Sequence, residues 1–80
     1  MATLFRLGNL RVVIYSDDHP PPHVHVLGPD GAARFRLNPP DGPVELWDQA
    51  GFRIAELNTI GAAIAERFDI CSAAWSRFHG

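Results

Sequence analysis

The residues best suited to chemistry lie in one short segment in the first third of the chain. Asp17, Asp18 and His19 stand directly before three consecutive prolines, and His23 and His25 follow them. On an extended strand, His23 and His25 point to the same side, about 7 Å apart. Imidazole and carboxylate ligands suit zinc, nickel or copper, and two histidines with one carboxylate suit non-haem iron. The candidate ligands of such a metal site are His19, His23, His25, Asp17 and Asp18.

The same segment could also perform acid–base catalysis, because histidine titrates near neutral pH and an aspartate can orient an imidazole. The candidates for this role are His19, His23, His25 and Asp18. However, the segment lacks the helical histidine spacing and the general-base glutamate of zinc hydrolases, and no serine or threonine has a nucleophile's context. We therefore expect no catalytic residues and no cofactor. A metal-dependent enzyme remains the alternative.

Turn residues divide the first half of the chain into strands that would position this segment. A Gly-Asn step separates residues 3–7 from residues 10–15, which are rich in β-branched side chains, and predicts a hairpin. Residues 23–27 and 32–37 alternate with a period of two around a Gly-Pro-Asp-Gly turn and predict a second hairpin. Residues 44–47 are expected to form a short strand or a single turn.

From Arg53 onward the chain has no proline, and its apolar residues follow a helical period. They form one stripe: Ile54, Leu57, Ile60, Ile64, Phe68, Cys71, Trp75 and Phe78. Gly61 and Asp69 weaken this helix of about 25 residues, so a bend or break near Phe68 is expected. The fold class is α+β: a small antiparallel sheet of three to four strands, packed on one face by the C-terminal helix or helices. The single domain, 1–80, is mainly β over 1–47 and mainly α over 53–79.

Alternation along the second hairpin predicts its register. If Val24 and Val26 share a buried face with Phe35, His25 lies opposite Arg34 and His23 opposite Arg36. A three-residue loop would instead set His25 against Phe35. We prefer the first register, because a slip by one residue would turn the valines away from the core.

The same alternation gathers polar residues on the opposite face of the sheet. The set comprises Arg6, Arg11, Tyr15, His23, His25, Arg34 and Arg36. Guanidinium groups beside aromatic rings suit the binding of phosphates or carboxylates. Alternatively, the face is only solvated, and its arginines pair with nearby aspartates. Both interpretations stay open at this stage.

Composition limits the class of protein. All seven basic side chains are arginine, and nine acidic ones give a net charge of −2, which argues against a general nucleic-acid binder. No apolar run approaches the length of a membrane span, so we expect a cytoplasmic protein without a membrane partner. The one cysteine, Cys71, excludes an internal disulfide. Its place on the apolar stripe favours core packing, and the alternatives are a disulfide between two copies or a reactive thiol.

The proline and histidine segment resembles the signature of a family of small bacterial proteins known as domain of unknown function 4160. The shared pattern is Asn/Asp-Asp-His, a proline pair and then His-x-His-Val, here within residues 17–26. Further similar positions are Gly51, Phe52, Glu56, Leu57, Ile60, Ile64, Trp75 and Phe78. The chain departs from the pattern in the extra Pro20, in lacking lysine and in its alanine-rich helix. The resemblance implies a few antiparallel strands followed by helix, and an accessory role in small gene modules, including candidate toxin–antitoxin pairs.

Taken together, these features predict a non-enzymatic binding module that contacts a protein or nucleoprotein partner, with local nucleic-acid contact as one form. A toxin–antitoxin component or a mobile-element inhibitor of a host defence complex, of the anti-CRISPR type, would act in this way. The alanine-rich C-terminal helix also suggests a homodimer. The alternative functions are a small metal-dependent hydrolase or nuclease using the Asp/His segment, and a purely structural subunit.

Overall fold

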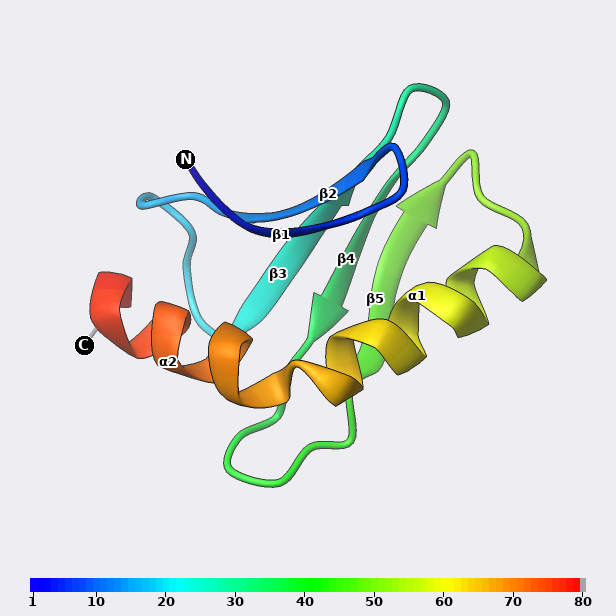
Figure 1. Ribbon diagram of the computed structural model, residues 1–80. Helices are drawn as coiled ribbons and strands as arrows, with labels where there is room; N and C mark the ends of the chain where they lie inside the picture. The colour runs from blue at the N-terminus through cyan, green and yellow to red at the C-terminus, as the bar shows by residue number, and fades with distance from the viewer. Residues whose placement is uncertain (80) are drawn as a thin grey trace.

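The computed structural model describes residues 1–79, which form one antiparallel sheet and two helices (Figure 1). The strands follow one another in chain order across the sheet: β1 (Ala2–Leu7), β2 (Leu10–Ile14), β3 (His23–Leu27), β4 (Ala32–Arg36) and β5 (Glu45–Ala50). The α+β class is confirmed, but the expected three to four strands are five. The short strand or single turn expected at residues 44–47 is part of the longer strand β5, which begins at Glu45. Its type and length were not evident because β5 is a mostly exposed edge strand, and so it lacks the apolar alternation of a half-buried strand.

Both predicted hairpins are present, and the register of the first shifts between Thr3 and Phe5. Leu7 lies opposite Leu10, and Gly8 between them has a φ of 58°, a conformation that glycine adopts without strain. In the second hairpin His25 lies opposite Arg34, so the preferred register is confirmed. The loop of this hairpin closes with a hydrogen bond in which Gly28 N–H donates to the carbonyl of Gly31, at 2.9 Å.

An irregularity between β4 and β5 brings a tryptophan to the polar face. Arg34 pairs with Asp48 and Phe35 with Leu46, so Trp47 is an extra residue in β5. A bulge of this kind bends the strand and redirects a side chain. Here the guanidinium group of Arg34 lies over the Trp47 ring.

The helical segment is divided as its weak points predicted. Helix α1 (Ile54–Glu66) and helix α2 (Phe68–His79) are separated at Arg67. Figure 1 shows both helices along the same face of the sheet. Within residues 1–79, no helix is long and apolar enough to cross a bilayer.

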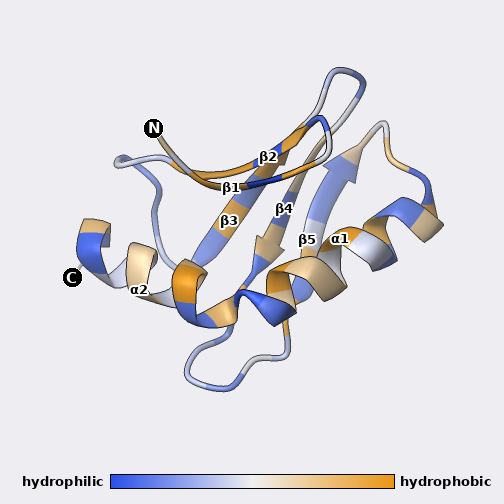
Figure 2. Cartoon of the chain, viewed as in Figure 1, coloured by the Kyte–Doolittle hydropathy of each residue, from blue (hydrophilic) through white to orange (hydrophobic). Residues whose placement is uncertain are grey.

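The core lies between the helices and the inward face of the sheet. Figure 2 shows apolar and polar residues alternating along β3 and β4, and the apolar ones face the helices. The buried cluster comprises Val12, Ile14, Val24, Val26, Ala33, Phe35, Leu37, Leu57, Ile60, Ile64, Cys71, Ala74 and Trp75. Phe68 of the predicted stripe is partly buried against this cluster. Two other members are exposed: Ile54 is 78% exposed and Phe78 39% exposed. They lie in the first and last turns of the helical segment, where the helices project past the sheet (Figure 1).

Candidate functional site

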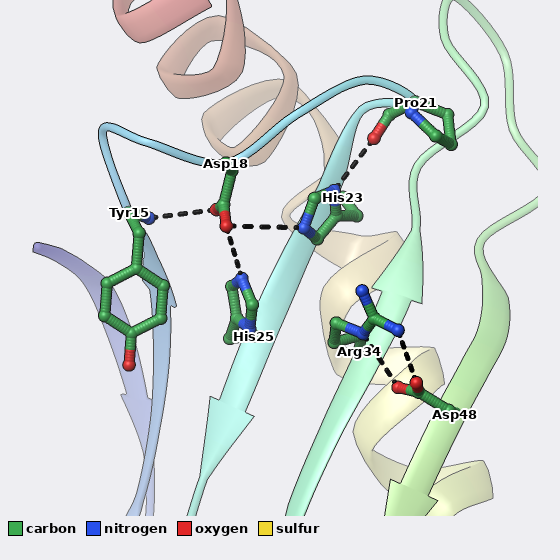
Figure 3. A network of polar contacts seen from close by, with 7 residues as sticks. All are labelled: Tyr15, Asp18, Pro21, His23, His25, Arg34 and Asp48. Carbon is green, nitrogen blue, oxygen red and sulfur yellow. Dashed lines mark hydrogen bonds and ion pairs between the residues drawn. The ribbon is translucent and has the colours of Figure 1, made fainter.

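The turn after β2 holds the carboxylate of Asp18 in one orientation (Figure 3). The backbone N–H of Tyr15 donates to Oδ2 of Asp18 at 3.0 Å, and the backbone N–H of Asp18 donates to the Tyr15 carbonyl at 3.1 Å. The aspartate side chain thus satisfies a strand-end amide, a common role for aspartate in turns. Its second oxygen, Oδ1, remains directed at β3.

Two imidazoles of β3 point to that oxygen. The Nε2 atom of His25 lies 2.8 Å from Oδ1 of Asp18, and Nε2 of His23 lies 3.6 Å from it. One nitrogen of each histidine and one oxygen of Asp18 all lie within 4.8 Å of one another. Of the five metal-ligand candidates in the sequence, Asp18, His23 and His25 therefore form a compact group, which we call the Asp-His cluster.

The ring of His23 is fixed by its surroundings. Only 3% of the residue is exposed, and its Nδ1 lies 2.8 Å from the carbonyl oxygen of Pro21. Trp47 and Trp75 pack around the ring, with centroid separations of 5.1 and 5.3 Å. His23 thus bridges the polar face of the sheet and helix α2.

The charge of Asp18 depends on these contacts. Its partial burial raises the pKa, but hydrogen bonds from His25 and the Tyr15 amide, together with the charges of both imidazoles, outweigh burial. The net result is a pKa below the ordinary value of an aspartate. Asp18 is therefore a carboxylate at neutral pH.

A second group of contacts lies beside the Asp-His cluster. Arg34 donates from Nε and Nη2 to the two carboxylate oxygens of Asp48, and this pairing lowers the pKa of Asp48. The Arg34 and Arg36 guanidinium carbons lie 4.1 and 4.6 Å from the centroid of the Trp47 ring. Such stacking restrains both arginines on the polar face.

Other predicted residues lie apart from this network. Arg6 and Arg11 are on the expected face but directly opposite each other in β1 and β2. Asp17 and His19 are exposed and outside the Asp-His cluster. They instead line an open pocket of about 270 Å³, together with Asp18, Pro20, His23, Arg34 and Trp47.

The sequence interpretation missed Trp47 and Asp48. Both lie in β5, the strand that was not recognised in full. The alternation that placed Arg34 on the polar face did not indicate a partner in β5, because the bulge at Trp47 that sets Asp48 opposite Arg34 has no clear sequence signal.

Cys71 packs in the core, as its place on the stripe predicted. It is 0% exposed, and burial raises the pKa of its thiol to about 11. A disulfide between two copies would require the sulfur to leave the core first.

The comparisons with known proteins bear on the whole chain. A family model described as a domain of unknown function, DUF4160, matches residues 9–76, a range that includes the Asp-His cluster, β5 and most of both helices. No curated protein and no solved structure gives a significant match. Because the family model spans most of the sequence, the chain belongs to the DUF4160 family.

Proposed function

We propose that this protein is a non-enzymatic binding module that docks an acidic protein surface on the polar face of its sheet. The observation that carries the proposal concerns Arg6, Arg11 and Arg36. Among residues 1–79, none of the three has a carboxylate within ion-pair distance. The helices cover the other face of the sheet (Figure 1). These guanidinium groups are therefore available to the carboxylates of a partner.

The pairing of Arg6 with Arg11 supports this role. The two residues face each other directly across β1 and β2. Like charges in that position destabilise a sheet. A partner carboxylate placed between them would relieve the repulsion, so the pair favours the bound state over the free one.

Arg36 is partly buried on the same face, and its side chain makes no hydrogen bond to a described residue. Its Nε atom is buried, so a partner carboxylate would meet the terminal guanidinium nitrogens rather than Nε. Glu45 is opposite Arg36 in register, but the Glu45 carboxylate accepts a hydrogen bond from Asn38 at 2.6 Å. Because Trp47 already restrains the Arg36 side chain, ordering it on binding costs little entropy. Tryptophan and arginine are also the residue types that contribute most at protein interfaces.

An acidic protein fits this face better than a nucleic acid does. The chain has a net charge of −2, and the carboxylates of Asp18 and Asp48 lie among the arginines. A phosphate backbone would meet these acidic groups along its path, whereas a folded partner can place its carboxylates only opposite arginines. A toxin–antitoxin component or an inhibitor of a host defence complex in the cytoplasm would use such a contact.

The test begins with photo-crosslinking in the source organism. A crosslinking amino acid replaces the exposed Thr3 on the polar face or, as the control, the exposed Ala62 on α1. The partner captured from position 3 is then purified, and its Kd is measured with Arg6→Glu and with the control Arg77→Glu on α2. We expect the Kd to rise about tenfold for Arg6→Glu and to change less than about threefold for Arg77→Glu.

The design separates binding from folding. Arg6→Glu converts a like-charge pair with Arg11 into an opposite-charge pair, so it should stabilise the fold by roughly 0.5 kcal/mol while weakening the complex. The proposal would be overturned if the partner crosslinked only from position 62, or if Arg6→Glu and Arg77→Glu lost the same amount of affinity for it. Capture of a nucleic acid from position 3, with anisotropy of a labelled single strand responding to the same variant, would also reject an acidic protein partner.

The sequence also suggested an alternative function, a metal-dependent hydrolase or nuclease. This function would require the Asp-His cluster to bind a metal ion.

A further inference from the structure

A buried histidine and a carboxylate face each other without a direct hydrogen bond. The carbonyl of Pro21 can only accept, so Nδ1 of His23, 2.8 Å away, donates its proton there. In the neutral ring this leaves a lone pair on Nε2, which points to Oδ1 of Asp18 at 3.6 Å. A carboxylate oxygen also presents lone pairs. Either a second proton on His23 or a bound cation would place a positive charge between the two acceptors.

The 3.6 Å separation suits a bridging cation better than a proton. A charge-assisted N–H···O bond is about 2.7–2.9 Å long. By contrast, a tetrahedral ion with bonds of about 2.0–2.1 Å holds neighbouring ligand atoms roughly 3.4 Å apart. His23 and Asp18 are therefore spaced like two ligands of one ion.

His25 supplies the third donor atom. Its Nε2 converges on the same oxygen of Asp18, and Figure 3 shows both imidazoles directed at this carboxylate. The 2.8 Å distance needs to lengthen by only about half an ångström to reach a ligand spacing. The side chain of His25 is 18% exposed, so it is less confined than that of His23 and can make this adjustment.

Outer contacts already orient two of the three donors. The His23 Nδ1–H bond to the Pro21 carbonyl selects the tautomer whose Nε2 can bind a metal. The Tyr15 amide occupies Oδ2 of Asp18 and leaves Oδ1 directed at the histidines. Hydrogen bonds of this type accompany most histidine and carboxylate ligands in metalloproteins.

The positive charge of Arg34 does not repel a cation bound at the Asp-His cluster. Arg34 acts electrostatically on Asp18, but its own guanidinium group is paired with Asp48. Arg36, which lies opposite His23, adds one positive charge. The fixed charges of Asp18, Asp48, Arg34 and Arg36 thus sum to zero around the cluster, so no net positive charge opposes a cation there.

We propose that Asp18, His23 and His25 bind one divalent first-row transition-metal ion, with zinc as the reference ion. Two imidazole nitrogens favour such an ion over magnesium or calcium, which prefer oxygen ligands. Three protein ligands leave a coordination position for water or an anion. The pocket of about 270 Å³, which borders Asp18 and His23, lies on the side of Arg34 and Trp47, where that position would open.

The experiment uses the full chain purified without an affinity tag, treated with a chelator and then dialysed. Calorimetric titration with Zn²⁺ should give one ion per chain, and Co²⁺ should give a visible spectrum of nitrogen and oxygen coordination. Asp18→Asn and His25→Gln should weaken binding by about 100-fold or more, because each removes a ligand. The control Asp30→Asn, at an exposed residue in the turn at the other end of β3, should change the affinity by less than about threefold.

Two readouts keep the proposal falsifiable. An asparagine at position 18 can still accept from the Tyr15 amide, and circular dichroism in chelator checks each fold. If the Asp18→Asn variant does not fold, the zinc affinity of His25→Gln, a substitution at a partly exposed residue, tests the site by itself. Absence of saturable binding, or an equal loss of affinity in the Asp30→Asn control, refutes the site. Arg6→Glu should bind zinc like the wild type, so failure of the metal site and failure of the docking face are distinguishable.

Discussion

His25 Nε2 lies 2.8 Å from Oδ1 of Asp18, although three prolines stand between the two residues in the chain. The loop of residues 15–22 leaves β2, reverses direction and returns to β3 (Figure 1). The contact therefore ties a loop to the central strand of the sheet. Its neighbour Asp17 is exposed and makes no equivalent contact among the described residues.

This difference predicts unequal effects of two adjacent substitutions. With chelator present, Asp18→Ala should lower the free energy of unfolding by about 2 kcal/mol, because the Tyr15 amide and His25 lose a charged acceptor. Asp17→Ala should change it by less than about 0.5 kcal/mol. Urea denaturation measures both. Similar losses in the two variants would contradict the assigned role of Asp18.

The Arg34–Asp48 pair predicts a shifted titration. Hydrogen bonds from Arg34 hold the pKa of Asp48 below its ordinary value. The contribution of the pair to stability is therefore present above the unfolded pKa, roughly pH 4, and is lost as the pH falls through the lower folded value. Carbon NMR of the Asp48 carboxyl should show the lowered pKa in the wild type and its return toward the ordinary value in Arg34→Gln. An unchanged pKa in that variant would mean that Arg34 is not its cause.

The buried thiol predicts slow chemistry at Cys71. Burial raises its pKa from 9.0 to about 11, so the thiolate fraction at pH 8 is roughly 100-fold smaller than in the unfolded chain. Modification by a thiol reagent should be at least that much slower in native protein than in urea. Since the folded state retains the proton, stability should fall as the pH rises from about 9 to 11, and Cys71→Ala should lack this slope. Rapid native modification would show that α2 does not cover the sulfur.

Alanine substitution should destabilise the protein by different amounts at two glycines with positive φ. A Cβ on Gly51, at φ 88°, would collide with the backbone carbonyl oxygen of Asp30, whereas a Cβ on Gly8, at φ 58°, meets no atom within 4 Å. Gly8→Ala should cost about 1 kcal/mol for the left-handed conformation alone. Gly51→Ala should cost at least twice as much. Thermal melts of both variants measure the difference, and equal costs would indicate that the loop of Asp30 yields freely.

Alanine substitution should have unequal effects on stability at two isoleucines of the apolar stripe. Ile64 is 0% exposed in the core, and Ile54 is 78% exposed in the first turn of α1. Ile64→Ala should destabilise the protein by about 2–5 kcal/mol through lost burial and a cavity. Ile54→Ala should stay within about 0.5 kcal/mol. A large loss at position 54 in chemical denaturation would instead point to an additional contact made by that residue.

Local pattern predicted much of the fold, because the responsible interactions are short in range. Period-two alternation and a Gly-Pro-Asp-Gly turn were enough to pair His25 with Arg34. The weak helical positions Gly61 and Asp69 anticipated the break, which lies at Arg67. Ile54 and Phe78 departed from the stripe because period alone does not show where a helix extends past its sheet.

The candidate site was only partly predictable. Residue types and spacing identified the segment 17–25 as chemically dense, but could not rank Asp17 against Asp18 or His19 against His23. That ranking depends on how the loop after β2 folds back, which involves the Tyr15 amide and the Pro21 carbonyl. Asp48, which neutralises Arg34, belongs to an edge strand without a clear pattern.

The sequence by itself determined the α+β order, the register of the second hairpin, the buried position of Cys71 and the face that holds the arginines, because each follows from periodicity and turn chemistry within a short window. Tertiary structure alone decided that Asp18, His23 and His25 converge, that Trp47 lies under two arginines, and that Asp48 pairs with Arg34. These contacts join separate elements through a loop reversal and a bulge. Their geometry is set by the packing of the whole sheet rather than by neighbouring residues.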